Sequence, residues 1–149
     1  MWYSAVGYLV TLALAILCAP FPADAQPPAK VPRIGYLRSD SPSTLPSRLA
    51  AFREGLRQLG YVEGQNIAIE ERWAEGRFER LPELVADLVR LPVDVIVTTG
   101  PPTVRAAQQA TRTIPIVVTV MHEPVAMGFV ASLARPGGNS TGQAFQDSE

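Results

Sequence analysis

The chain has 149 residues, 47% of them hydrophobic, and its 13 Lys and Arg residues nearly balance its 14 Asp and Glu residues. This balance leaves no basic excess for phosphate binding, and the apolar content is too high for a disordered chain, so composition argues against a nucleic-acid-binding or disordered protein. Because there is a single cysteine, neither a disulfide framework nor a thiolate metal cluster is expected.

The first 25 residues are expected to be a secretory signal peptide and not part of the fold. Residues 5–18 form an uncharged apolar run, and residues 20–25 (PFPADA) add two prolines and a small-x-small triplet, which predicts cleavage after Ala25. Two alternatives stay open. Residues 1–22 are almost long enough for an uncleaved membrane anchor, and Cys18 would be the modified residue of a lipoprotein.

After a Pro-rich lead-in at residues 26–32, short apolar runs alternate with amphipathic stretches. Leu49, Phe52, Leu56 and Leu59 recur at helical spacing, for example, whereas residues 94–99 have the continuous β-branched character of a strand covered on both faces. Strands are expected at 33–37, 67–73, 94–99, 114–120 and 140–145, and helices at 49–59, 81–91, 104–111 and 125–134. This order predicts an α/β fold, an open parallel sheet with helices on both faces.

In such sheets, ligands bind beyond the carboxyl ends of the strands, where the strand order reverses. Three loops follow strands at that edge: residues 39–47, 99–103 and 121–124. We therefore expect any functional site to be assembled from these loops.

The loops carry hydroxyls and a lone histidine, and each feature has more than one interpretation. Ser39, Ser41 and Thr99 could bind a ligand, or could cap helices and face solvent. The helix start after Gly100 could hold an anion, but Pro101 and Pro102 remove two N–H donors from that turn.

His122 stands next to Glu123, which suggests an acid–base pair, a pocket-lining pair or a solvated loop. Adjacent side chains point apart, and the chain has no second histidine to complete a metal site. No G-x-S-x-G nucleophile turn occurs either, so the sequence offers little for hydrolytic chemistry.

Three segments together resemble the substrate-binding proteins of bacterial ABC-type importers. They are RIGYL (33–37), FREGLRQLGYVEGQNIAIEERWAEGRFERLPELVADLVRLPVDVIVTTG (52–100) and QQATRTIPIVVTVMHEPVAMGFVASLARPGGNSTG (108–142). Some members of that family resemble binders of aromatic amino acids. The resemblance implies a type I periplasmic binding protein fold, in which two α/β lobes close around a ligand.

The resemblance also implies a function: capture of a small solute, such as an amino acid, in the periplasm for an ABC permease of the inner membrane, without enzymatic activity, cofactor or nucleic acid. By position it points to eight ligand-binding residues: Ser39, Ser41, Thr99, Gly100, Pro101, Met121, His122 and Glu123. The family's x-D-P-V loop reads His122-Glu123-Pro124-Val125 here, so glutamate keeps the negative charge on an arm one methylene longer.

Family members run about twice as far as this chain. Residues 33–138 are therefore expected to be the first lobe, and residues 139–149 the start of the crossing to a second lobe that the chain lacks. Two alternatives remain: a decayed or fragmentary lobe that binds no ligand, and a flavodoxin-like enzyme that uses His122 and Glu123.

Overall fold

The computed structural model describes residues 30–44, 46–132, 134–135 and 137–145. The expected signal peptide lies outside the described residues. The fold below is that of the unit formed by Val31–Glu149. No helix among the described residues has the length and apolar character needed to cross a membrane.

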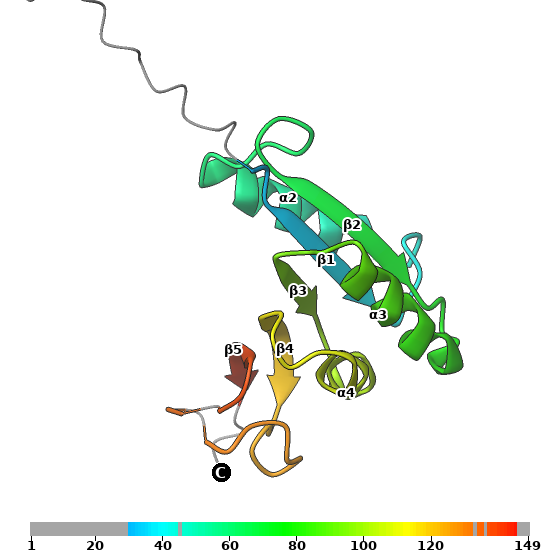
Figure 1. Ribbon diagram of the computed structural model, residues 1–149, viewed down its shortest axis with the longest axis vertical. Helices are drawn as coiled ribbons and strands as arrows, with labels where there is room; N and C mark the ends of the chain where they lie inside the picture. The colour runs from blue at the N-terminus through cyan, green and yellow to red at the C-terminus, as the bar shows by residue number, and fades with distance from the viewer. Residues whose placement is uncertain (1–29, 45, 133, 136, 146–149) are drawn as a thin grey trace, which may run out of the picture. The chain divides into compact units, whose positions relative to one another are not determined.

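Five parallel strands form one open sheet, which confirms the expected fold class (Figure 1). They are β1 (Arg33–Arg38), β2 (Ala68–Trp73), β3 (Val95–Thr98), β4 (Ile116–His122) and β5 (Ser140–Phe145), in the order β2-β1-β3-β4-β5. The chain moves from β1 outward to β2 and then returns to the other side of β1 for β3. The strand order therefore reverses between β1 and β3, and this is the switch point of the sheet.

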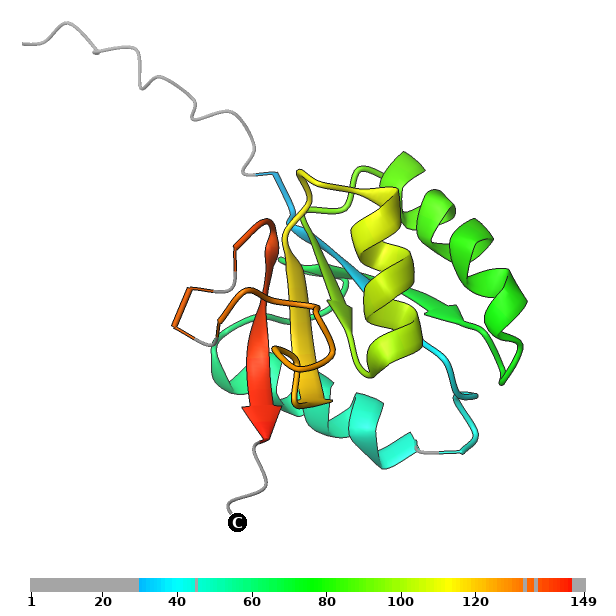
Figure 2. The same ribbon diagram turned by 90° about the horizontal axis from the view of Figure 1, so that it is seen from below.

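Helices cover both faces of the sheet, as expected (Figure 2). Helix α2 (Pro46–Gln58) lies on one face, and α3 (Leu81–Arg90) and α4 (Pro101–Ala110) lie on the other. A short 3₁₀ helix, η1 (Phe78–Arg80), leads into α3, where Pro82 occupies the first turn. Proline fits there because the first turn has no intrahelical use for its missing N–H.

Alternation along β1 divides the core into two clusters. Ile34 and Tyr36 pack toward Leu49 of α2, whereas Leu37 packs with Leu88 of α3 on the opposite face. Between them, Gly35 lets α3 approach closely, because a Cβ at that position would stand 3.1 Å from a methyl group of Leu88. The sheet is therefore anchored on both sides at β1, next to the switch point.

The expected helix at 125–134 is wrong for the residues described there. Pro124–Gly128 form turns, and the N–H of Phe129 bonds to the carbonyl of Pro124 at 2.9 Å. Gly128 adopts a positive φ of 72°, which a continuing helix cannot contain. The segment therefore folds back as a loop against α4.

Two smaller expectations are also corrected. The helical spacing predicts that the first helix extends to Leu59, but α2 ends at Gln58 and Leu59 stands in the following turn, 75% exposed. The expected loop at 121–124 is shorter than predicted, because Met121 and His122 form the end of β4.

Candidate functional site

The three loops expected to form a site follow strands that are neighbours in the sheet. Because β1, β3 and β4 are adjacent and parallel, their carboxyl ends lie at one edge, with the switch point between β1 and β3. This edge brings together Ser39, Thr99 and Gly100 with His122 and Glu123 at the end of β4. We call it the carboxyl edge.

The hydroxyl of Thr99 forms a hydrogen bond to a neighbouring strand. Its Oγ1 donates to the carbonyl of Val120 on β4 at 3.1 Å. A hydroxyl whose proton is used in this way keeps its oxygen as an acceptor. Thr99 could therefore accept a hydrogen bond from a ligand while it holds β4 in place.

Helix α4 begins at the carboxyl edge with few donors. Gly100 is its N-cap at a φ of 78°, and the Gly100 N–H donates to the carbonyl of Val120 at 3.3 Å. Pro101 and Pro102 have no N–H, so Thr103 is the first residue of the helix that can donate one. An anion placed here would gain the helix dipole but little direct hydrogen bonding.

Sequence reasoning missed a buried ion pair at the end of β1. Arg38 is 6% exposed, and its Nε and a terminal nitrogen donate to the two carboxylate oxygens of Asp40 at 3.0 and 2.6 Å. These hydrogen bonds lower the pKa of the Asp40 carboxyl, while burial raises the pKa of the neighbouring Tyr36 phenol. An arginine at the end of an apolar strand, two residues before an aspartate, was the available signal.

This ion pair lies at the base of the loop that carries the two candidate serines. The carbonyl of Ser39 accepts the N–H of Gly76 at 2.7 Å, which ties the loop to the one after β2. Farther out, the hydroxyls of Ser41 and Ser43 share a hydrogen bond of 2.9 Å at the surface. The first-strand loop is thus fixed at its base and polar at its tip.

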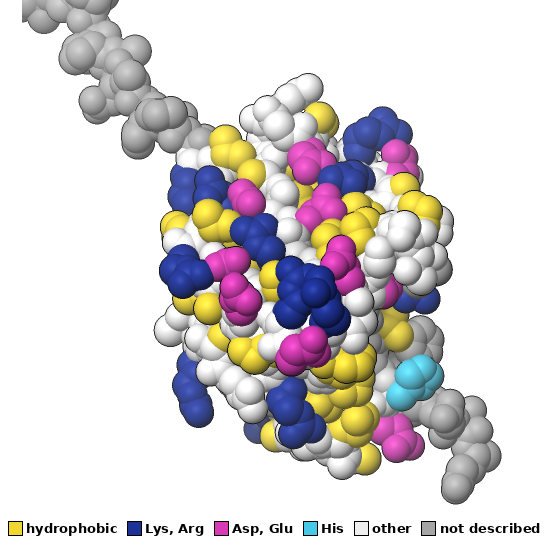
Figure 3. Space-filling view, turned by 90° about the vertical axis from the view of Figure 1, so that its right-hand side faces the viewer, with side chains coloured by type: hydrophobic (Ala, Val, Ile, Leu, Met, Phe, Trp, Pro, Cys, Tyr) yellow, Lys and Arg dark blue, Asp and Glu magenta, His cyan; other side chains and the backbone are white. Residues whose placement is uncertain are grey.

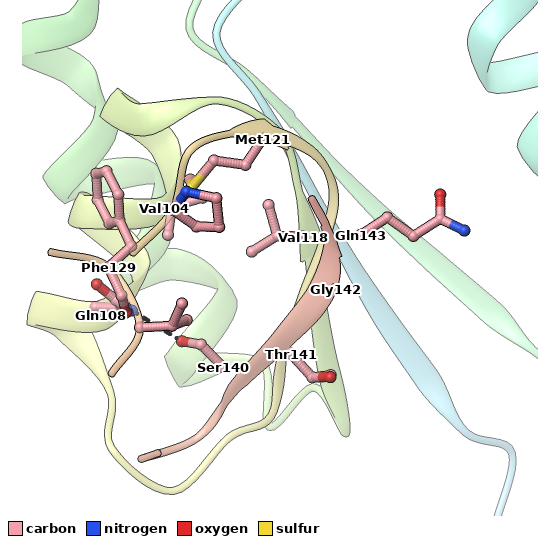
Figure 4. A pocket seen from close by; sticks show the side chains of 11 residues that line it. Val104, Gln108, Val118, Met121, Phe129, Ser140, Thr141, Gly142 and Gln143 are labelled. Carbon is pink, nitrogen blue, oxygen red and sulfur yellow. Dashed lines mark hydrogen bonds between the residues drawn. The ribbon is translucent and has the colours of Figure 1, made fainter. Parts of the chain in front are cut away.

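A β-bulge near the end of β4 changes the direction of the Met121 side chain. Val118 and Met121 pair with Gly142 and Ala144 of β5, so β4 uses one residue more than β5 over this stretch. The extra residue turns Met121 into the core on the α4 side, where it is 3% exposed and lies near Val104 (Figure 4).

The crevice beside Met121 holds a volume of only 40 Å³, whereas ligand pockets usually measure several hundred. Its side chains pack against one another: the amide nitrogen of Gln108 donates to Ser140 Oγ and to the carbonyl of Phe129, each at 3.0 Å (Figure 4). Met121 therefore packs the layer beneath the carboxyl edge.

His122 and Glu123, by contrast, are exposed. Figure 3 shows the imidazole of His122 at the surface, beside apolar side chains. Glu123 adopts a φ of 42°, a left-handed conformation that costs a non-glycine residue energy and is more frequent at functional positions. Three half-exposed apolar side chains, Val120, Val125 and Met127, flank these two residues in the chain.

Two other features are outside this site. Among the described residues, no group of three or more His, Cys, Asp or Glu side chains is placed to hold a metal ion. A hollow of 630 Å³ lies at the other end of α4, lined by Gln108, Arg112 and the loop that leads to Asn139. Asn139 secures this loop by donating to the carbonyl of Ile114 at 2.7 Å.

Known structures share the fold of this lobe. A ligand-free, open substrate-binding protein with adhesive properties from Clostridium difficile is 29% identical, with a TM-score of 0.72 over 79% of this chain and 40% of that one. A Streptococcus pneumonia protein in complex with L-Trp is 26% identical, with a TM-score of 0.69 over 76% of this chain and 38% of that one. The chain thus spans well under half of each structure.

A curated relative, the tyrosine-binding protein of Clostridioides difficile, is 35% identical over 91 residues, which are 61% of this chain and 26% of the relative. The family model for ABC transporter substrate binding proteins matches residues 41–148. That description is of a binding protein, so the enzyme alternative built on His122 and Glu123 is set aside. The chain belongs to the ABC transporter substrate-binding protein family.

Proposed function

We propose that this chain supplies one lobe of an extracytoplasmic solute-binding component of an ABC importer, and that its solute is an amino acid held at the carboxyl edge. The observation that carries the proposal is that three loops follow neighbouring strands at the carboxyl edge, which includes the switch point, in a sheet with this family's fold. The export signal expected in residues 1–25 and a permease partner in the inner membrane belong to the same proposal.

An amino acid needs three kinds of contact, and the carboxyl edge offers each. The Glu123 carboxylate suits the ammonium group, and the hydroxyls of Ser39 and Ser41 after β1, together with the dipole of α4 after β3, suit the carboxylate. Val120 and Met127 add apolar surface for a large side chain, since each is at least 40% exposed. Relatives that bind tyrosine and carry L-Trp support an aromatic amino acid as the first class to test.

One lobe provides one wall of the site. A solute pocket normally buries most of its ligand, and every 1.4 kcal/mol of lost contact weakens affinity about tenfold. We therefore expect this lobe alone to bind in the millimolar range, with tighter binding only where a second lobe closes over the solute.

The test is an NMR titration of the ¹⁵N-labelled chain with L-tyrosine, L-tryptophan and L-phenylalanine. We expect saturable shifts of the Ser39, Gly100 and Glu123 amides, and about tenfold weaker binding by Glu123→Gln, because a charge-assisted hydrogen bond is lost. Glu83→Gln, an exposed acid in the first turn of α3, is the matched control and should bind as the wild type does. The proposal is overturned if no amino acid shifts these amides, or if both variants bind alike.

A further inference from the structure

We propose that Thr98 and Thr119 are positioning residues, whose hydroxyls hold the carboxyl ends of β1, β3 and β4 at fixed spacing and so set the geometry of the solute site. The inference deepens the proposed function and rests on it for the identity of the site. The claim about strand spacing can be tested without any solute.

The backbone ladder between β3 and β4 stops short of the loops. Its register runs from Ile96 opposite Ile116 to Thr98 opposite Val118, and the bulge of β4 begins immediately afterwards. This bulge lies in the pairing of β4 with β5, where it leaves one residue of β4 unpaired and interrupts the regular hydrogen bonds. The register of β4 with β3 ends at Val118, so the regular ladder does not hold the last residues of β4, which lead to Glu123, against β3.

Threonine hydroxyls continue the connection across this gap. Thr119 Oγ1 donates to the carbonyl of Thr98 at 3.3 Å, which links β4 to β3. Thr98 Oγ1 donates to the carbonyl of Leu37 at 3.1 Å, which links β3 to β1. The bonds of Thr99 Oγ1 and the Gly100 N–H to the Val120 carbonyl then lie one step farther toward the edge.

Packing alone does not require threonine at position 98. Thr98 is 1% exposed and follows Ile96 and Val97, both buried and apolar, so valine would fill the same volume. A buried hydroxyl such as that of Thr98 must be bonded to offset its loss of water; its bond goes to a carbonyl on the next strand, as does that of the half-buried Thr119. Compared with valine, threonine adds a hydrogen bond that fixes the distance between the ends of neighbouring strands.

That distance matters because the candidate contacts stand on different strands. Ser39 follows β1, Thr99 follows β3 and Glu123 follows β4. If β4 moved relative to β3, Glu123 would move relative to the two hydroxyls, and a solute would have to order the edge before binding. A site whose spacing is set in advance avoids that cost.

The first experiment measures amide hydrogen exchange by NMR in the full chain carrying Thr119→Val. We expect the Gly100 amide, which bonds to Val120, to exchange about five- to tenfold faster, as expected for the loss of one hydrogen bond. The Ile96 amide bonds to Pro115 at the amino end of the same strand pair and should keep its rate. Thr119→Ser should restore the Gly100 rate because it keeps the hydroxyl.

Thr113→Val is the matched control, since Thr113 is exposed and precedes β4 at the opposite edge. It should leave the Gly100 exchange rate unchanged. The inference is overturned if Thr119→Val leaves Gly100 unchanged, or if it accelerates Ile96 as much as Gly100, which would indicate a general loss of stability.

The second experiment measures L-tyrosine affinity by the same NMR titration. Thr119→Val should weaken binding about three- to tenfold and Thr119→Ser should restore it, with equal urea midpoints for both variants. If the wild type binds no L-tyrosine, the proposed solute class fails, while the exchange rates still decide the inference. If Thr119→Val binds L-tyrosine as tightly as the wild type, the positioning role is overturned and the proposed function stands.

Discussion

Replacing Gly142 with alanine is expected to lower the free energy of unfolding by about 3 kcal/mol, the upper range for steric overpacking. A Cβ at Gly142 would stand 2.1 Å from the carbonyl oxygen of Val118 on the paired strand. That neighbour is backbone, so it cannot rotate away as a flexible side chain would. Relief requires β5 to shift off β4, with loss of the ladder between them.

The measurement is urea unfolding followed by far-ultraviolet circular dichroism. Gly55→Ala is the control, because a Cβ there meets nothing within 4 Å and alanine favours a helix interior. It should raise stability by about 0.5–1 kcal/mol, the opposite sign for the same chemical change. Equal midpoints for Gly142→Ala and the wild type would show that β5 contributes nothing to the folded state.

Gly142→Ala should also affect the candidate site, because β5 supports the end of β4. His122 pairs with Phe145 at the end of β5, and Ser140 accepts a hydrogen bond from Gln108 of α4. When β5 leaves, the end of β4 loses support on its outer side. Gly142→Ala should therefore also broaden or shift the NMR signals of His122 and Glu123, far from the substituted residue in sequence.

The sheet was predictable because its central strands, β1 and β3, are buried on both faces. The residues of β3 form a continuous apolar run, and the buried residues of α3 recur at helical spacing. In each element the sequence pattern therefore agrees with the burial in the folded chain. Parallel order and helices on both faces followed from the alternation alone. The loops at the carboxyl edge were then fixed by topology, whatever their sequences.

The segment after β4 was not predictable in the same way. Residues 125–134 contain enough apolar residues for a short helix, but Phe129 is only 8% exposed and packs in the core through a turn. The cost of an irregular backbone is offset by that burial, which depends on contacts with α4. Periodicity within one segment carries no information about such contacts.

The site itself was predicted at the level of loops and not of side-chain direction. Thr99, His122 and Glu123 belong to the carboxyl edge, but Met121 turns inward because the bulge inserts one residue into β4. A one-residue insertion moves each later side chain to the other face of a strand, and no sequence pattern marked it. The Arg38–Asp40 pair was missed because a charged strand end reads as the start of a solvated loop.

Breaking that pair gives the second large expected effect. Asp40→Asn should cost about 2 kcal/mol at pH 7, because Arg38 would remain 6% exposed without its carboxylate partner. The value lies below the range of about 3–5 kcal/mol for fully buried pairs, because the Asp40 side chain is 23% exposed and water can partly replace it. The loop with Ser39 and Ser41 should loosen with it, seen as faster exchange of the Gly76 amide that bonds to Ser39.

The pH dependence follows from the direction of the shift. Hydrogen bonding from Arg38 lowers the pKa of Asp40 in the folded chain. The ionised Asp40 therefore contributes fully to stability at pH values above the ordinary aspartate pKa near 3.9. This stability contribution is lost as the pH falls through the lowered pKa that Asp40 has in the folded chain. Urea midpoints measured from pH 7 down to pH 2 should therefore fall more steeply for the wild type than for Asp40→Asn.

The exposed pair of Glu54 and Arg57 on α2 is the matched control, since it has similar hydrogen bonds without burial. Glu54→Gln should leave the urea midpoint at pH 7 unchanged, because solvent and salt screen a surface pair. If Asp40→Asn proved equally harmless, Arg38 would not depend on Asp40 in the folded chain. Its backbone bonds to Glu75 and Gly76 would then be enough to hold the base of the loop after β1.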